Sequence, residues 1–247
     1  MNDDTPHEDQ VDERSVSGLA ETDPDGAPHL NLEVFRNTTL TEQVYANLRR
    51  GMLMGVWKPD QRMSARQLSR TMNVSPTPVR EAMMRLVNEG ALEMTATREF
   101  RTPKLSRDAY AEITRMRMAL EPMAAELAAP IISEAEIATL IRANESLEQA
   151  VSAEKFDVAL EFDTEFHLGL YAAARQPLLL STINALLLRA GPTRTRLSGE
   201  YRKSRTGLGH HKNIITALRS RDGQAARDEI AADLQDGSRV ILAVLDE

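Results

Sequence analysis

The stretch that decides the fold of this chain is Ser64–Gly90, SARQLSRTMNVSPTPVREAMMRLVNEG. Ser64 is a favourable N-cap, and Gln67 three residues later completes the pattern of a capping box. Asn73 stands where the chain must turn, and asparagine tolerates the left-handed backbone that a short turn between helices often needs. The stretch therefore predicts a short helix, a tight turn and a second helix.

The second helix has two different faces. Ser75 predicts its cap, Pro76 fits the first helical position, and Gly90 fits its end. An apolar stripe at helical spacing faces inward: Val79, Met83, Leu86 and Val87. Thr77 and Arg80 lie on the opposite face near the N-terminus, where such side chains can reach base edges or phosphates. An ordinary amphipathic helix pair would also show arginines on its polar face.

The flanking residues extend this pattern to a winged helix. Thr39 and Glu42 predict a capping box at the start of an earlier helix. Residues 91–95 and 100–103 predict a short hairpin with its tip at 96–99. Arg98 and Arg101 would then lie in the wing as candidate phosphate or minor-groove contacts, and the alternative for each is a solvated charge.

The distribution of charge supports nucleic-acid binding although the whole chain carries −7. Residues 1–35 carry a net charge of −9, residues 36–107 carry +7, and residues 108–247 carry −5. The positive charge is thus concentrated where the helix-turn-helix is predicted, as phosphate binding requires. Residues 1–36 are acidic and lack hydrophobic periodicity, which predicts a disordered tail.

Composition places further limits on the chain. Its 247 residues contain no cysteine, which excludes disulfides and thiolate metal sites and is consistent with the cytoplasm. No apolar run reaches the ~18 residues of a membrane span, and the acidic N-terminus is unlike a signal peptide. Residues 106–247 show helical periodicity without a strand pattern. We expect a mainly α chain, with an N-terminal winged helix-turn-helix followed by an all-helical bundle of six to seven helices.

The helices expected in this half follow from caps and apolar spacing. Their approximate ranges are 106–129, 133 onward, 156–174, 178–190, 192–201, 210–221 and 223–244. Ser133 and Glu136 predict another capping box. Pro192 is expected to open a helix, and residues 202–209 are expected to form a loop.

These motifs resemble a known family. SPTPVREAM at 75–83 is similar to the signature of the GntR family of bacterial transcription regulators. With GVWKP at 55–59, ALEMTATREFRTPKLS at 91–106 and the helical C-terminal half, the chain resembles the FadR-like branch with an FCD effector domain. The resemblance covers roughly 40–244. Many family members have Arg at the position of Pro76 and Gly at the position of Glu99.

The resemblance implies a domain organisation and a DNA-binding role. The expected domains are an acidic tail at 1–36, a winged helix at 37–105 and an FCD-like effector and dimerisation domain at 106–247. The family also implies a DNA role for Arg66. The candidate DNA contacts are Arg66, Ser75, Thr77, Arg80, Arg98 and Arg101.

The resemblance also implies a metal site in the bundle. Asp163 and His167 are four residues apart and share one helical face, which by spacing alone is also typical of an ordinary hydrogen-bonded pair. In the FCD domain an Asp and three His on three helices hold a metal, and the matching positions here are Asp163, His167, His211 and Asp233. An aspartate thus stands in place of the third histidine. A divalent ion such as Zn, Ni or Mn is expected.

The leading functional hypothesis is a transcription regulator, with repression the usual role, and not an enzyme. It would be a homodimer on a pseudo-palindromic double-stranded operator, with no membrane partner, and its DNA binding would respond to an effector. Arg117 matches a position near the family's pocket, which suits a small organic or sugar acid, although it could equally form a surface pair with Glu121. The alternatives are a metal-dependent hydrolase and a DNA-binding dimer with a ligand-free bundle.

Overall fold

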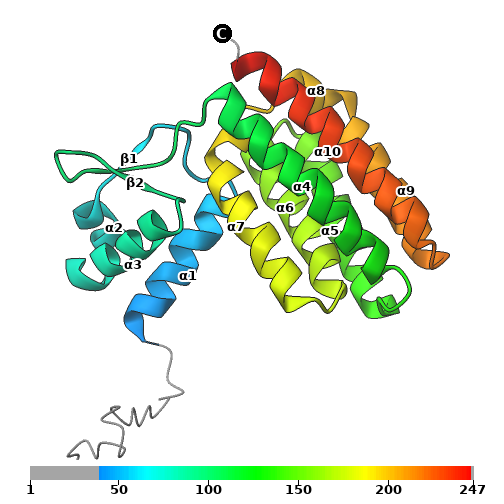
Figure 1. Cartoon of the computed structure of the whole chain (residues 1–247), viewed down its shortest axis with the longest axis horizontal. Coiled ribbons are helices and arrows are strands. Elements are labelled where there is room, and N and C mark those ends of the chain that lie inside the picture. The colour runs from blue at the N-terminus through cyan, green and yellow to red at the C-terminus, as the bar shows by residue number, and fades with distance from the viewer. Residues whose placement is uncertain (1–38, 246–247) are drawn as a thin grey trace, which may run out of the picture. The chain divides into compact units, whose positions relative to one another are not determined.

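The computed structural model describes residues 39–245, so the predicted acidic tail at 1–36 lies outside the described residues. Figure 1 shows the elements in chain order. They are α1 Leu40–Leu53, β1 Arg62–Met63, α2 Ala65–Thr71, α3 Pro76–Asn88, β2 Glu93–Met94, β3 Phe100–Arg101, α4 Arg107–Ala128, α5 Glu134–Ser152, α6 Phe156–Ala173, α7 Pro177–Arg194, α8 Gly199–Ser204, α9 Thr206–Arg219 and α10 Gly223–Leu245. The mainly α fold with an N-terminal winged helix is confirmed.

Local signals explain the helix-turn-helix. Asn73 adopts φ 52° in the turn between α2 and α3, and Gly90 adopts φ 71° after α3, as left-handed positions after helices favour. Ser64 accepts a hydrogen bond from the Gln67 amide, but the structure gives only this half of the predicted capping box. Ser75 occupies the N-cap of α3 without a side-chain cap bond.

The wing contains one strand more than the predicted hairpin. β2 and β3 pair antiparallel, with Glu93 opposite Arg101, and β1 pairs with the other edge of β3, giving the order β1-β3-β2. β1 has only two residues, too few for alternation of polar and apolar side chains to reveal a strand. It exists because β3 offers it hydrogen-bonding partners.

The bundle comprises α4 to α10 within the described residues, and two local predictions about it were wrong. Pro192 does not open a helix but lies in the last turn of α7, where the lost N–H removes only one late hydrogen bond. Residues 202–209 are not a loop. α8 and α9 are separated by Arg205 alone, whose φ of 60° makes the turn. The predicted capping box of Ser133 and Glu136 opens α5 as expected.

The C-terminal end of α1 packs closely against the bundle. A Cβ atom built on Gly191 of α7 would lie 2.2 Å from the Met52 carbonyl oxygen, so only glycine allows this approach. A Cβ atom built on Gly55, which has φ 69°, would lie 2.4 Å from the Leu160 side chain of α6. One continuous apolar cluster includes Leu48 and Met52 of α1 together with core residues of the bundle. No helix in residues 39–245 has the length and apolar character of a membrane span.

Candidate functional site

A hollow on the winged helix gathers three of the predicted DNA-contacting arginines. Arg66 of α2, Arg80 of α3 and Arg98 of the wing line this hollow, whose volume is about 430 Å³. All three side chains are exposed and form no ion pair within the described part of the chain. Arg62 of β1 lines the same hollow and was missed, because β1 itself was not predicted. We call Arg62, Arg66, Arg80 and Arg98 the recognition arginines.

The other predicted DNA contacts are placed differently. Ser75 and Thr77 are exposed at the start of α3 but do not line the hollow. Arg101 is half-buried, and its Nη1 donates to the Asp60 carboxylate at 3.0 Å. Glu99, the residue that replaces a family glycine, pairs with Arg62 at 2.9 Å. Ion pairs within the winged helix therefore neutralise part of the positive charge of the wing.

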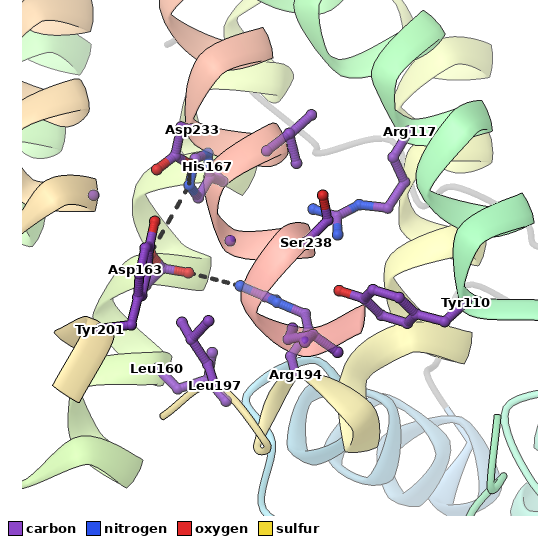
Figure 2. A pocket seen from close by; sticks show the side chains of 14 residues that line it. Tyr110, Arg117, Leu160, Asp163, His167, Arg194, Leu197, Tyr201, Asp233 and Ser238 are labelled. Carbon is purple, nitrogen blue, oxygen red and sulfur yellow. Dashed lines mark hydrogen bonds and ion pairs between the residues drawn. The ribbon is translucent and has the colours of Figure 1, made fainter. Parts of the chain in front are cut away.

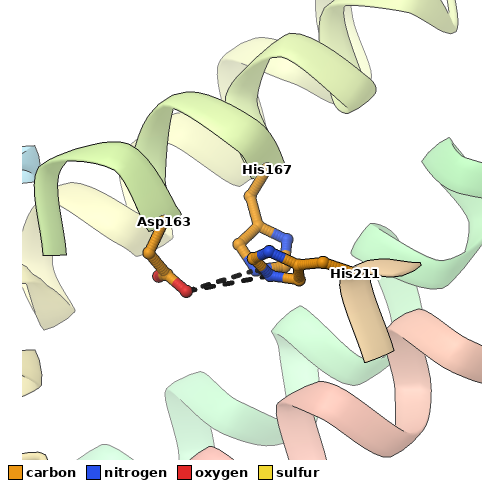
Figure 3. A group of neighbouring side chains, drawn as sticks. All are labelled: Asp163, His167 and His211. Atoms are coloured by element: carbon orange, nitrogen blue, oxygen red, sulfur yellow. Dashed lines mark hydrogen bonds and ion pairs between the residues drawn. The ribbon is translucent and has the colours of Figure 1, made fainter. Parts of the chain in front are cut away.

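The bundle brings together three of the predicted metal ligands. Asp163 and His167 project from the same face of α6, and His211 approaches from α9, as Figure 3 shows. Ligand atoms of these three residues all lie within 4.8 Å of one another. The two Nε2 atoms are 3.2 Å apart, and Asp163 Oδ1 is 3.9 Å from His167 Nε2 and 3.8 Å from His211 Nε2.

Asp233 of α10 contacts one member of this group, His167. Its Oδ2 lies 3.2 Å from His167 Nε2, and its side chain is largely buried. A tetrahedral ion with bonds near 2.0–2.1 Å separates its ligands by about 3.3 Å. The two 3.2 Å spacings at His167 Nε2 match this value, whereas Asp163 Oδ1 is about half an ångström further from each imidazole. Two carboxylates would balance the charge of a divalent cation. We call Asp163, His167, His211 and Asp233 the ligand cluster.

Buried neighbours orient both imidazoles. The Tyr171 hydroxyl donates to Glu121 at 2.7 Å and therefore accepts from His167 Nδ1, 3.2 Å away. Asn144 Oδ1 accepts from His211 Nδ1 at 3.1 Å. In the neutral rings these bonds place the hydrogen on Nδ1 and leave both Nε2 lone pairs directed at the same point. This is the arrangement in which histidine binds a metal.

The ionisation of the cluster reflects burial and opposing charges. Burial alone would lower the pKa of His167, but the hydrogen bond with Asp233 and the charge of Asp163 outweigh it and raise that pKa. Burial and the neighbouring His167 lower the pKa of His211 to about 4. Burial would raise the pKa of Asp163, yet His167 and Arg194 lower it. The cluster therefore keeps a carboxylate and a neutral imidazole available as ligands.

A cavity of about 80 Å³ adjoins the cluster. In Figure 2, Arg117 and Tyr110 lie across this cavity from His167 and Asp233. Arg117 does line it, as an effector contact would, but its guanidinium already donates to Glu121 at 2.6 and 3.2 Å. This pair is buried, whereas sequence reasoning had considered an exposed one.

Sequence reasoning missed several residues around the cluster. Arg194 of α7 also lines the cavity and donates to Asp163 Oδ2 at 2.6 Å, as the dashed line in Figure 2 marks. The one sequence signal that could have identified Arg194 is the presence of arginine in a helix as apolar as α7. Tyr171 lies four residues after His167, a spacing that could have identified it as a partner. Nothing local distinguishes Asn144. His210, next to His211, pairs instead with Glu229 and Asp236.

Comparison with known proteins identifies both halves. Residues 40–99 match the model of the bacterial regulatory proteins of the gntR family, and residues 112–236 match the FCD domain. The HTH-type transcriptional regulator McbR of Escherichia coli (strain K12) is 28% identical over 208 residues, which cover 83% of this chain and 94% of McbR. The transcriptional repressor RspR of the same strain is 27% identical, covering 84% and 91%.

Solved structures agree with these matches. The structure of E. coli McbR/YncC is similar with a TM-score of 0.75 and 27% identity, and it covers 84% of this chain and 97% of that one. A GntR regulator from Rhodococcus sp. RHA1, at 19% identity and a TM-score of 0.69, shares the fold. The chain belongs to the GntR family of bacterial transcription regulators: it is a DNA-binding regulator with an FCD domain, and not an enzyme.

Proposed function

We propose that this regulator is a repressor whose operator binding is controlled by a divalent cation and a small carboxylate in the bundle. The observation that carries the proposal is the convergence of Asp163, His167 and His211, with Asp233 against His167, beside a cavity. Two arginines, Arg117 and Arg194, line this cavity. A bound cation would supply Lewis acidity and positive charge at this point. Two carboxylates and two imidazoles suit Zn, Ni or Mn.

The cavity limits the effector. Its volume of about 80 Å³ holds only a few non-hydrogen atoms, so a small organic acid fits better than a large sugar acid in this conformation. Arg194 and Arg117 would give the acid a positive environment, with Tyr110 and Tyr201 supplying hydroxyl groups from the lining. Because Arg117 already pairs with Glu121, it would contribute to effector binding mainly through its electrostatic potential.

On DNA, the recognition arginines would contact phosphates and base edges. Because one winged helix covers a short half-site, we propose a homodimer on a pseudo-palindromic operator. Exposed apolar side chains on the bundle support self-association: Met116 and Leu127 lie eleven residues apart on α4, so they share one face, and Ile131 follows. The domain boundary at 105–106 stays a prediction, between the family matches that end at 99 and begin at 112.

The first test measures metal content by elemental mass spectrometry on untagged protein purified without chelators. We expect about one ion per chain in the wild type and almost none in Asp163→Ala/His167→Ala, because the variant removes two of the three side chains whose ligand atoms lie together. His210→Ala is the matched control, since this neighbouring histidine pairs outside the cluster. Absence of metal from the wild type, even after loading with Zn²⁺, would overturn the metal site.

The second test measures the affinity of the protein for operator DNA. A duplex selected from a random-sequence library by the wild-type protein serves as the operator probe, and its affinity is compared with Zn²⁺, with EDTA and with Zn²⁺ plus acetate. A change in affinity that depends on the ligand cluster supports regulation through the bundle. Equal affinity under all three conditions would favour the alternative in which the bundle only dimerises.

A further inference from the structure

A line of polar contacts runs from the ligand cluster to the end of α1. Asp163 Oδ1 faces the two imidazoles, while its Oδ2 accepts from Arg194 Nη2 at 2.6 Å. Arg194 Nη1 donates to the Thr164 hydroxyl at 3.1 Å. That hydroxyl in turn lies 3.3 Å from the carbonyl oxygen of Leu53, the last residue of α1. One carboxylate is thus two hydrogen-bonding side chains away from the DNA-binding domain.

The Arg194 and Thr164 side chains in this line are shielded from water, whereas Asp163 is partly exposed. Thr164 is 1% exposed and Arg194 is 8% exposed. A buried polar group that loses its partner cannot turn to solvent instead, so a shift at one contact must be accommodated at the next. The close approach of Gly191 to Met52 and of Gly55 to Leu160 leaves little free volume there, so a water molecule cannot replace a lost hydrogen bond between these helices.

Thr164 provides the two-state element that such coupling needs. Its hydroxyl has one proton but two carbonyl oxygens within reach, that of Leu160 in its own helix at 2.8 Å and that of Leu53 at 3.3 Å. Donation to Leu160 keeps the bond within α6, whereas donation to Leu53 joins α6 to α1. Arg194 approaches the same oxygen as a donor, so its position biases the direction of the proton.

We propose that Arg194 and Thr164 are positioning residues that transmit the state of the ligand cluster to α1. This inference rests on the proposed function, because it takes Asp163 as a ligand. When Asp163 Oδ1 binds the cation, the carboxylate and its charge are drawn towards the imidazoles. The hydrogen bond that Oδ2 accepts from Arg194 then changes in strength. Thr164 then redistributes its hydrogen bond between Leu160 and Leu53. α1 carries the change to α3, since the Tyr45 hydroxyl donates to Glu89 at the end of α3.

The test is hydrogen–deuterium exchange of the full chain with Zn²⁺ and with EDTA. Two regions are compared: residues 160–170 with 208–216 report the ligand cluster, and residues 48–58 report the end of α1. We expect Zn²⁺ to slow exchange at the cluster and to change exchange at 48–58 in the wild type. In Thr164→Val the cluster response persists and the response at 48–58 is lost. Thr164→Ser, which keeps the hydroxyl, restores it.

Control variants separate transmission from general damage. Glu165→Gln removes an exposed pair with Arg50 beside Thr164, and we expect both responses to remain. Zn²⁺ affinity by calorimetry should change in Thr164→Val by less than the ~10-fold that loss of a group orienting a ligand causes. If Thr164→Val misfolds, Thr164→Ala replaces it, and hydrogen–deuterium exchange is measured in the same two regions.

The outcomes distinguish the two proposals. No response at the cluster in the wild type would overturn the metal site and, with it, the relay. A response at the cluster without one at 48–58 would overturn the relay alone. An equal response at 48–58 in wild type and Thr164→Val would also overturn the relay, because coupling would then pass through packing. Loss in Thr164→Val with recovery in Thr164→Ser supports it.

Discussion

The two halves of this molecule use arginine in opposite ways. The winged helix keeps Arg66, Arg80 and Arg98 exposed around a hollow, without ion pairs among the described residues. The bundle buries Arg117 and Arg194, each bonded to a carboxylate at 2.6 Å. An exposed cation remains available to a polyanion, whereas a buried one must be neutralised where it lies. The surface charges therefore serve binding, and the buried charges hold a site in shape.

The largest effect is expected where a buried charge loses its partner. Glu121→Gln leaves the Arg117 guanidinium inside the bundle without a countercharge, and we expect a loss of about 3–5 kcal/mol in the free energy of unfolding. Denaturant unfolding measures it. Glu165→Gln, which breaks the exposed pair with Arg50, should cost no more than about 1 kcal/mol. Similar losses in the two variants would show that burial does not set the role of these charges.

The next effect concerns DNA rather than stability. Arg80→Ala should weaken binding of the selected operator by about 1–3 kcal/mol if the side chain reads a base, with unfolding nearly unchanged. Arg85 on the same helix is the matched control, because it stacks on Tyr45 at 3.8 Å and pairs with Glu89. Fluorescence anisotropy at fixed salt compares the variants. If Arg85→Ala lost more affinity than Arg80→Ala, the hollow would not be the DNA-binding face.

The two halves also differ in how far the sequence predicts them. Asn73 and the Thr39–Glu42 box act through neighbours a few residues away, so their sequence positions suffice to place the turn and the start of α1. Asp163 and His167 share a face for the same reason. The bond of Arg194 to Asp163 joins residues 31 positions apart, and only the packing of α6 on α7 creates it. β1 likewise depends on its partner strand, which no local pattern encodes.

A smaller effect tests how the bundle orients its ligands. Asn144→Ala removes the acceptor that fixes the ring of His211, and we expect Zn²⁺ affinity to fall about 10–100-fold because the lone pair is no longer directed at the cluster. Calorimetric titration of the purified variant measures this. Asn213→Ala is the control, since that amide lies outside the cluster and bonds Glu229. Unchanged affinity in Asn144→Ala would mean that packing against Phe166, stacked 3.9 Å from His211, suffices to orient the ring.

The smallest effect compares two serines that occupy the same position in different helices. The Ser133 hydroxyl caps α5 by accepting a hydrogen bond from the Glu136 amide within a capping box. Ser133→Ala should therefore lower the free energy of unfolding by about 1 kcal/mol. Ser75 caps α3 without any side-chain cap bond, so Ser75→Ala should cost less stability.

Operator binding should reverse that order. The Ser75 hydroxyl is exposed at the N-terminus of α3, where a phosphate can accept its proton, whereas Ser133 is remote in sequence from the recognition helix. Thermal unfolding and operator titration of both variants measure the two quantities. Equal losses of stability would mean that Ser75 caps α3 in solution. The Ser75 hydroxyl would then stabilise α3 as Ser133 stabilises α5. The contrast between a DNA-binding surface and a structural interior would then not apply to the N-caps of these two helices.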